Sequence, residues 1–328
     1  MTETRSYTWP ATLRLPPRPP KVVYLDLNHW VALAKANTGH RDGHQFRDAL
    51  AACIAAVEAG AVVFPISVSI YMEVTKIRQR QRRVDLRHVI ERVSGYRAIT
   101  PRPVIEEHEV EALLDRLLGP SPIPIQATDY LDRGFAHAHG SRQSDVSDLE
   151  PELSRWALDG PAAEEERLLP HFKYNPMATY EVQLQRAAEE TEQVERFNAD
   201  PSWRDPRIRK VVRLREIGSE IGEMLSRGLI ARGLEPAVLT KFGSGLDAFD
   251  SMPSFDVSVS LKTAYHRNPK HRWTPNDIHD IDALAGTVPY CDIVVTDKAE
   301  RGHLVDTGVA ERLNTTVLSR VTDLIQHL

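Results

Sequence analysis

Two short apolar segments, separated by most of the chain, constrain the fold more than any other feature of the sequence. Residues 22–25 (Val-Val-Tyr-Leu) run into Asp26, and residues 293–296 (Ile-Val-Val-Thr) run into Asp297. A continuous apolar run of this length is typical of a strand buried on both faces, as in a parallel sheet. A helical pattern follows Asp26. The sequence therefore predicts a sheet that draws strands from both ends of the chain.

Further strands and helices are expected near these two segments. Strand candidates lie at residues 61–66, 96–100 and 315–318, and helical patterns lie at residues 45–59, 86–93 and 106–118. Strands that alternate with helices favour an α/β fold with a parallel sheet flanked by helices.

The middle of the chain has a different pattern. Residues 120–253 show no clear strand, and charged amphipathic stretches such as 179–197 dominate there. We expect a long all-helical insertion that splits the sheet domain. The predicted organisation is an extended, proline-rich tail (1–20), the first half of the core (21–119), the insertion (120–253) and the second half of the core (254–328).

Composition excludes several classes of protein. The 328 residues carry 41 Lys and Arg against 46 Asp and Glu, a net charge of −5, so any site for a polyanion must be local. Two cysteines are too few for a disulfide scaffold or a thiolate zinc site and fit a cytoplasmic location. The uncharged stretch at residues 59–72 is shorter than the about 20 residues that a membrane span needs. No membrane partner is expected.

The two strand-end aspartates, Asp26 and Asp297, are the first candidates for a functional site. Ligands bind beyond the carboxyl ends of the strands in an open parallel sheet, so the two carboxylates share one crevice if their strands are neighbours. The alternative is that each aspartate only caps the helix that follows it, a common role for Asp. The sequence leaves both roles open.

Glu73 is a third candidate acid. Its neighbours on the helix, Ile70 and Ile77, are apolar, which places the carboxylate on or beside the buried stripe. Burial of an ionised carboxylate is unfavourable unless a cation or hydrogen bonds compensate. An ion pair with Lys76 explains the charge but not the buried face, so a functional role is favoured.

The helix expected at residues 275–286 carries three aspartates. At about 100° per residue, Asp277 falls within the apolar face of this helix and Asp280 at the margin of that face. Both can present carboxylates to one point, while Asp282 is expected to be solvated and His279 to lie on the far side. Acidity in a first helical turn is also expected from the helix dipole, which explains Asp277 more readily than Asp280.

Four or five carboxylates without His or Cys ligands form an all-oxygen site, which suits Mg²⁺ or Mn²⁺. Two such ions about 3.5–4 Å apart can hold a phosphodiester, activate water and stabilise the leaving oxygen. The acids therefore indicate phosphodiester hydrolysis by a two-metal site.

These pieces, in this order, resemble the PIN-domain nucleases, specifically a larger PIN-like branch with a helical insertion. The matching segments are residues 24–33, 66–74, 276–284 and 290–297. The resemblance implies Asp26, Glu73, Asp280 and Asp297 as catalytic, metal-holding acids and Asp277 as a competing or accessory ligand. It implies Asn28 and Thr296 as polar supports of the cluster. Toxins of toxin–antitoxin pairs belong to this family, so an antitoxin partner or a homodimer remains an open alternative.

A basic and aromatic segment precedes the third acidic motif. Residues 265–273 contain Arg267, Lys270 and Arg272 together with two aromatic and two histidine side chains. Cations mixed with aromatics suit single-stranded nucleic acid, through phosphate pairing and base stacking. An ordinary solvated loop is the equal alternative. The arginine-rich run at residues 78–87 is the densest basic stretch, for which a solvated face is the commoner role.

The leading hypothesis is a Mg²⁺- or Mn²⁺-dependent endonuclease that cuts RNA, with single-stranded DNA as a second possible substrate. A second hypothesis is a PIN-like nucleic-acid-binding or regulatory protein that no longer cuts. A third is a phosphomonoesterase of the haloacid dehalogenase type. That chemistry needs an aspartate two positions after Asp26, where this chain has Asn28.

Overall fold

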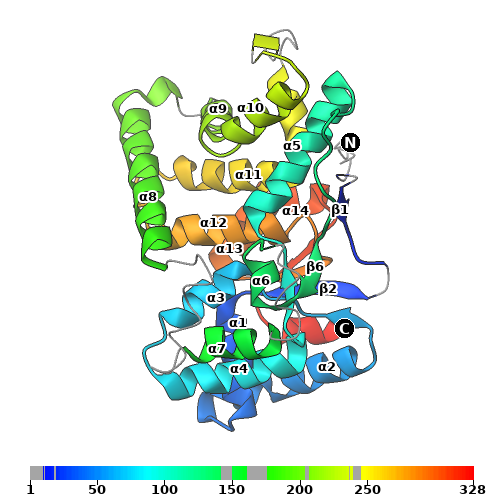
Figure 1. Cartoon of the computed structure of the whole chain (residues 1–328). Helices are drawn as coiled ribbons and strands as arrows, with labels where there is room; N and C mark the ends of the chain where they lie inside the picture. The colour runs from blue at the N-terminus through cyan, green and yellow to red at the C-terminus, as the bar shows by residue number, and fades with distance from the viewer. Residues whose placement is uncertain are drawn as a thin grey trace.

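A mostly helical α/β structure surrounds a small parallel sheet (Figure 1). The computed structural model describes residues 10, 12–17, 20–141, 150–160, 176–203, 207–235, 237–238 and 245–328. Residues 1–9 of the expected tail and parts of the expected insertion lie outside the described residues.

The central sheet has the strand order β3-β2-β7-β8, and all of its neighbours are parallel. Its strands are β2 (Lys21–Leu25), β3 (Val62–Val63), β7 (Ile293–Val295) and β8 (Thr316–Leu318). Leu25 is in register with Val295, so the two strands end side by side. The expected parallel sheet built from both ends of the chain is confirmed.

Both faces of the sheet are buried, which is why its strands are uninterrupted apolar runs. Val23 and Leu25 belong to one apolar core, while Val22 and Tyr24 belong to another on the opposite face. The first core is covered by α1 (Leu27–Asn37), α2 (Arg47–Glu58) and α4 (Arg80–Ser94), and the second by α12 (Pro275–Thr287), α13 (Lys298–Asp306) and α14 (Val309–Arg312).

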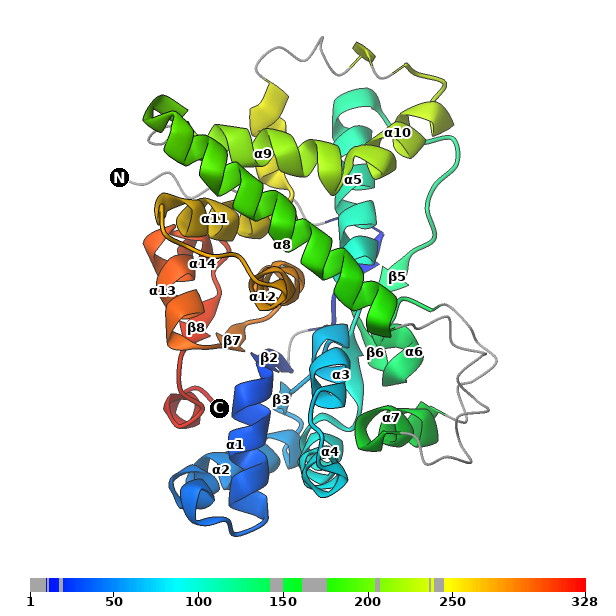
Figure 2. The same cartoon turned by 90° about the vertical axis from the view of Figure 1, so that its left-hand side faces the viewer.

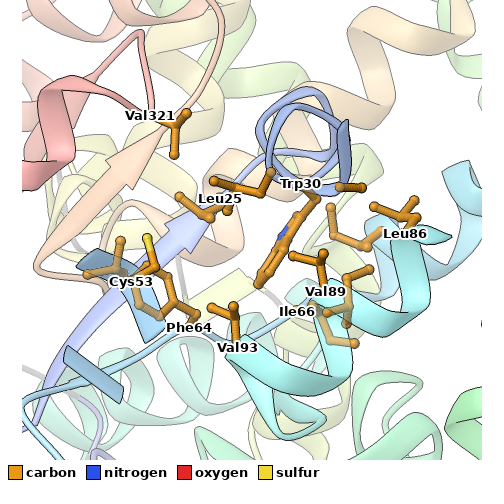
Figure 3. Close-up of a cluster of buried hydrophobic side chains, with 14 of the residues drawn as sticks. Leu25, Trp30, Cys53, Phe64, Ile66, Leu86, Val89, Val93 and Val321 are labelled. Carbon is orange, nitrogen blue, oxygen red and sulfur yellow. The ribbon is translucent and has the colours of Figure 1, made fainter. Parts of the chain in front are cut away.

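The first core is centred on Trp30. This side chain is fully buried, and Figure 3 shows its ring among Leu25, Ile66 and Val89. Helix α3 (Val68–Thr75) comes after β3 in the chain, and α4, which follows it, packs on α1. This core fixes the start of α3, which carries Glu73.

A third core lies in the upper helical layer of Figure 1, above α12. Its long central helix, α11 (Pro253–Arg267), packs on α9 (Ile208–Ser219) and α12. The other described helices of this layer and of the lower edge are α5 (Arg102–Leu118), α6 (Gly134–Ala138), α7 (Glu150–Asp159), α8 (Pro176–Ala199) and α10 (Gly222–Ala231). Short 3-10 helices occupy Arg41–Phe46, Pro201–Trp203, Gly245–Ser251 and Asp323–Gln326.

The expectation of an all-helical segment at residues 120–253 is wrong in two places. Strands β5 (Thr128–Asp129) and β6 (Leu131–Arg133) lie within it. β5 pairs with β1 (Leu13–Arg14), so this part of the expected tail is also held in a strand, with Leu13 buried. β6 pairs antiparallel with β4 (Arg97–Ile99). Strands of two or three residues leave too short an apolar pattern to be recognised in a sequence.

No helix in the part of the chain that the structure describes has the length and apolar character to cross a membrane.

Replacing Trp30 with alanine tests the first core. We expect the free energy of unfolding to fall by about 3–5 kcal/mol, because a large buried side chain leaves a cavity. Trp203, which is 47% exposed, is the matched control, and Trp203→Ala should change the value by less than about 1 kcal/mol. Urea denaturation measures both, and equal losses in the two variants would contradict the central position of Trp30.

Candidate metal centre

Asp26 and Asp297 follow the neighbouring strands β2 and β7. The backbone N–H of Asp26 donates to Val295 O at 2.9 Å, which continues the ladder between the two strands. The chain passes from β2 to β3 on one side and reaches β7 on the other, so strand order reverses between β2 and β7. Ligands of open α/β sheets bind at such a point. The structure therefore brings the two strand ends together as the sequence predicts.

Both aspartates also cap helices, the alternative that the sequence left open. Asp26 Oδ1 accepts from Leu27 N at 2.7 Å at the start of α1, and Asp297 Oδ1 accepts from Glu300 N at 2.8 Å at the start of α13. Each of these bonds uses one carboxylate oxygen. The caps fix the direction of each carboxylate and leave Oδ2 available, so the two roles are compatible.

Glu73 lies on α3 with a side chain that is 20% exposed. The expected alternative partner, Lys76, donates instead to Asn276 Oδ1 at 3.5 Å. The partner of Glu73 is His279 of α12, whose Nε2 lies 3.2 Å from Glu73 Oε1. Glu73 thus lies beside an imidazole rather than a lysine.

Asp280 is the least compensated acid of α12. No hydrogen bond or ion pair joins its side chain to any other residue in the described ranges. Burial, followed by the nearby carboxylates of Asp26, Glu300, Glu73 and Asp297, raises the pKa of Asp280 from 3.8 to about 8. The same causes, burial first and then Glu73 and Asp297, raise the pKa of Asp26 from 3.8 to about 6. Asp26, Glu73 and Asp297 therefore lie close enough to Asp280 to contribute to its raised pKa.

Asp277 is engaged as a helix cap. Its carboxylate accepts from Thr274 N at 2.6 Å and Thr274 Oγ1 at 2.9 Å, while Thr274 Oγ1 accepts from Asp277 N, which forms a capping box. His271 Nε2 lies 3.5 Å from its Oδ2. These carboxylate contacts all use Oδ2 of Asp277. Of the two candidates for the third acid, Asp280 is therefore the one whose two oxygens both lack a partner among the described residues.

Two expectations about α12 are wrong. Asp282 is not solvated: Arg186 of α8 binds it through two hydrogen bonds of 2.6 and 3.0 Å, and Arg102 of α5 also binds it. Burial would raise the pKa of Asp282, but the two guanidinium groups hold it well below its usual range. His279 is 2% exposed and does not face solvent. Both errors arise because α12 is enclosed by helices on more than one side, so its polar face is buried as well.

Glu300 is an acid of this region that the sequence analysis missed. It lies one turn after Asp297 on α13, is 2% exposed, and accepts a short hydrogen bond from Tyr265 Oη. Its Oε2 has no partner among the described residues. Burial raises the pKa of Glu300 to about 7, with further contributions from Asp297, Asp277 and Asp26. The spacing of three residues from Asp297 is the signal that could have identified it.

A cavity of about 380 Å³ adjoins the cluster, and the residues lining it include Asp277, Asp280, Asp297 and Glu300. Figure 2 shows α13 and α3 on either side of β2 and β7, with α12 above them. A larger cavity, of about 570 Å³, lies beside β5, β6 and α6 and shares no lining residue with this one. The carboxylates, and not the larger cavity, mark the candidate site.

The geometry of a bound metal ion is not preformed in the described part of the chain. No group of three or more His, Cys, Asp or Glu side chains among those residues is arranged to hold an ion. The donor set nevertheless fits a hard divalent cation, because it consists of carboxylates without a lysine or arginine partner among the described residues.

The two predicted polar supports differ. Thr296 is buried, and its backbone O lies 3.1 Å from His29 Nε2. The side chain of Asn28 is exposed and makes no hydrogen bond within the described residues. The structure thus places Thr296 beneath the site and leaves Asn28 in solvent.

The expected base-stacking surface at residues 265–273 is absent. Tyr265 and Trp273 are 9% and 7% exposed and pack against each other, with ring centroids 5.2 Å apart. The three cations of this segment, Arg267, Lys270 and Arg272, are exposed. The segment therefore offers positive charge to a phosphate backbone but no aromatic face to a base.

The arginine-rich run after α3 is divided between two roles. Arg83 donates to the backbone of Asp159 and Ile77, and Arg87 pairs with Asp159 and Glu91, so both hold α4 in place. Arg78, Arg80 and Arg82 are exposed. Only the exposed three are available to a polyanion.

Comparison with known families, with curated proteins and with solved structures finds no match for this chain.

The raised pKa values predict how stability depends on pH. Folding raises the pKa of Asp280 from 3.8 to about 8. Proton binding by Asp280 therefore contributes fully to the free energy of unfolding below about pH 4, and this contribution is lost as the pH rises through 8. In EDTA, Asp280→Asn should therefore increase the free energy of unfolding by about 1–3 kcal/mol at pH 9 and by much less at pH 5. Urea denaturation at the two pH values measures this difference.

The exposed carboxylate of Glu58 on α2 provides the control. Glu58→Gln should change stability by less than about 0.5 kcal/mol at both pH values. An equal gain for Asp280→Asn at pH 5 and pH 9 would contradict the crowding of carboxylates around Asp280.

Proposed function

We propose that the chain is a PIN-like, Mg²⁺- or Mn²⁺-dependent endonuclease that hydrolyses phosphodiester bonds, with RNA as the substrate. The observation that carries the proposal is that Asp26 and Asp297 follow the neighbouring strands β2 and β7, with Glu73 of α3 and Asp280 of α12 close to them. Several carboxylates gathered in this way do not stabilise a fold by themselves, and a cation bound between them would account for their presence.

Under this proposal the free oxygens of Asp26, Asp280 and Asp297, with Glu73, hold the ions, and Asp277 and Glu300 lie at the edge. Bound ions of this kind supply an acidified water and stabilise the charge of the leaving oxygen. The protein contributes the orientation of the acids: the caps at α1 and α13 fix Asp26 and Asp297. No basic side chain is required within the site.

Exposed cations near the cluster suit the phosphate backbone of the substrate. Lys270 and Arg272 belong to the loop that leads into α12, and Arg78 follows the end of α3. Contacts of this kind bind RNA or single-stranded DNA without regard to sequence. Selection of RNA, a toxin role with an antitoxin partner, and a homodimer remain proposals that derive from the resemblance.

A cytoplasmic location accompanies the proposal. Cys53 and Cys291 are both free and buried, as is usual in a reducing compartment.

A second candidate function is nucleic-acid binding by a PIN-like protein that does not cut. It is favoured by one observation, the lack of a preformed ion-holding arrangement among the described residues. RNA binding in a gel shift without turnover in any divalent metal would support this second function.

Removal of single acids tests the enzyme activity. Asp26→Asn and Glu73→Gln should each reduce cleavage of unstructured RNA in Mn²⁺ or Mg²⁺ by about 100-fold or more, because each removes stabilisation of charge in the transition state. EDTA should abolish cleavage by the unmodified protein. Glu58→Gln, on an exposed part of α2, should retain full activity. Cleavage that survives both EDTA and Asp26→Asn would rule out the mechanism.

Metal binding should also be visible as stabilisation. A ligand that binds only the folded state adds about 2.7 kcal/mol at 100 times its Kd, so saturating Mn²⁺ should raise the melting temperature by several degrees. Asp26→Asn and Asp280→Asn should remove most of this increase. Thermal melts with EDTA and with Mn²⁺ measure the effect, and identical midpoints for the unmodified protein would count against the metal site.

A further inference from the structure

His279 lies between the acid cluster and the upper helical layer. Its Nε2 is 3.2 Å from Glu73 Oε1 and 3.3 Å from the backbone O of Ser69, and its Nδ1 is 3.0 Å from Gln183 Nε2. Both ring nitrogens are therefore engaged, one toward α3 and one toward α8. His279 is the sole polar partner of the Glu73 side chain in the described ranges.

The contact with Gln183 fixes which nitrogen of His279 carries the proton. The Nε2 group of a glutamine side chain only donates hydrogen bonds, so His279 Nδ1 must accept. The ring proton is then on Nε2, which donates to Ser69 O at 3.3 Å and lies 3.2 Å from Glu73 Oε1. Gln183 thus sets the tautomer and orientation of the ring that lies beside the Glu73 carboxylate.

The register of α8 on α12 is held one turn further along both helices. Arg186 follows Gln183 by three residues, Asp282 follows His279 by three residues, and the two form a bidentate ion pair. Arg186 also pairs with Glu220 at 2.8 Å. This part-buried ion pair joins α8 to α12 one turn beyond the contact between Gln183 and His279, and so supports the same register of the two helices.

A histidine buried with both nitrogens engaged is often only a structural residue. Such a role would require partners for the ring but not a site carboxylate among them. Ser69 O and Gln183 alone would satisfy the ring of His279, so the position of Glu73 Oε1 only 3.2 Å from Nε2 is the additional fact. Ser69 lies four residues before Glu73 on α3, which places both residues on the side of that helix that faces His279.

We propose that His279 and Gln183 are positioning residues that hold the Glu73 carboxylate in its place in the acid cluster. Gln183 of α8 acts through His279 of α12 on Glu73 of α3, and the helical layer thereby completes the site on the sheet. This inference rests on the proposed function. Groups that orient a metal-binding side chain in this way typically change metal affinity or activity by about 10–100-fold when removed.

The test compares four variants in the full chain. His279→Ala should weaken Mn²⁺ binding, measured by titration calorimetry, by about 10–100-fold and lower kcat for RNA cleavage by a similar factor. KM for RNA should stay within about twofold, because no contact to the substrate is removed. His279→Gln, whose amide can place an N–H near the position of Nε2, should restore a large part of both losses.

Gln183→Ala should show the same pattern at a smaller size, about 3–10-fold, because His279 remains but is no longer oriented. Gln185→Ala is the matched control on α8: Gln185 is exposed and donates only to Glu189 at 3.1 Å. This control should leave Mn²⁺ affinity and kcat unchanged. Gln183→Ala also keeps the test open if His279→Ala fails to fold.

Three outcomes would overturn the inference. Folded His279→Ala with unchanged Mn²⁺ affinity would show that His279 is only structural, while the proposed function would stand. Equal effects of Gln183→Ala and Gln185→Ala on Mn²⁺ affinity and kcat would show that Gln183 has no positioning role. An unmodified protein that neither binds Mn²⁺ nor cuts RNA would overturn the proposed function and this inference together.

Discussion

The pairing of β2 with β7 is the contact on which the candidate site depends. It joins residues about 270 positions apart in the sequence, with Val23, Tyr24 and Leu25 opposite Ile293, Val294 and Val295. Asp292 reinforces the pair, because its Oδ2 accepts from Val22 N at 2.8 Å and its own N–H donates to Val22 O at 2.9 Å. Without this ladder Asp26 and Asp297 would have no reason to be near each other, and the caps at α1 and α13 would orient two unrelated carboxylates.

The sequence was sufficient to predict the strands of the sheet and the acids that directly follow them. A buried strand is a short apolar run, and Asp26 and Asp297 mark where two such runs end. Glu73 could be identified because an acid beside apolar helix neighbours is unusual. What surrounds a helix cannot be seen in its own sequence. Asp282 and His279 were assigned to solvent because an apolar stripe defines only one buried face, whereas α12 contacts α3, α5, α8 and α11. The burial of Tyr265 and Trp273, and the position of Glu300, depend on tertiary packing in the same way.

Charged groups elsewhere in the structure show how this chain normally treats buried acids. Glu216, which is fully buried, accepts from Lys262 Nζ at 2.7 Å, and Glu190 binds Lys262, His266 and Arg215. Asp282 has two guanidinium partners. These buried carboxylates are matched with cations, as the cost of burying a charge requires, and the buried carboxylate of Glu109 is instead held by hydrogen bonds from Ser254 and Tyr290. Asp280, by contrast, has no hydrogen-bond or ion-pair partner among the described residues, and Oε2 of Glu300 has none either. The contrast inside a single molecule is stronger support for a functional site than the number of acids.

The order of the strands has a consequence for synthesis of the protein. β2 leaves the ribosome early, but its partner β7 and Asp297 follow only after some 270 further residues have been made. The growing polypeptide cannot assemble the four acids during that interval, and it must keep the apolar edge of β2 from pairing elsewhere. Under the proposed function, cleavage of RNA therefore has to wait until Asp297 has been made and β7 has paired with β2.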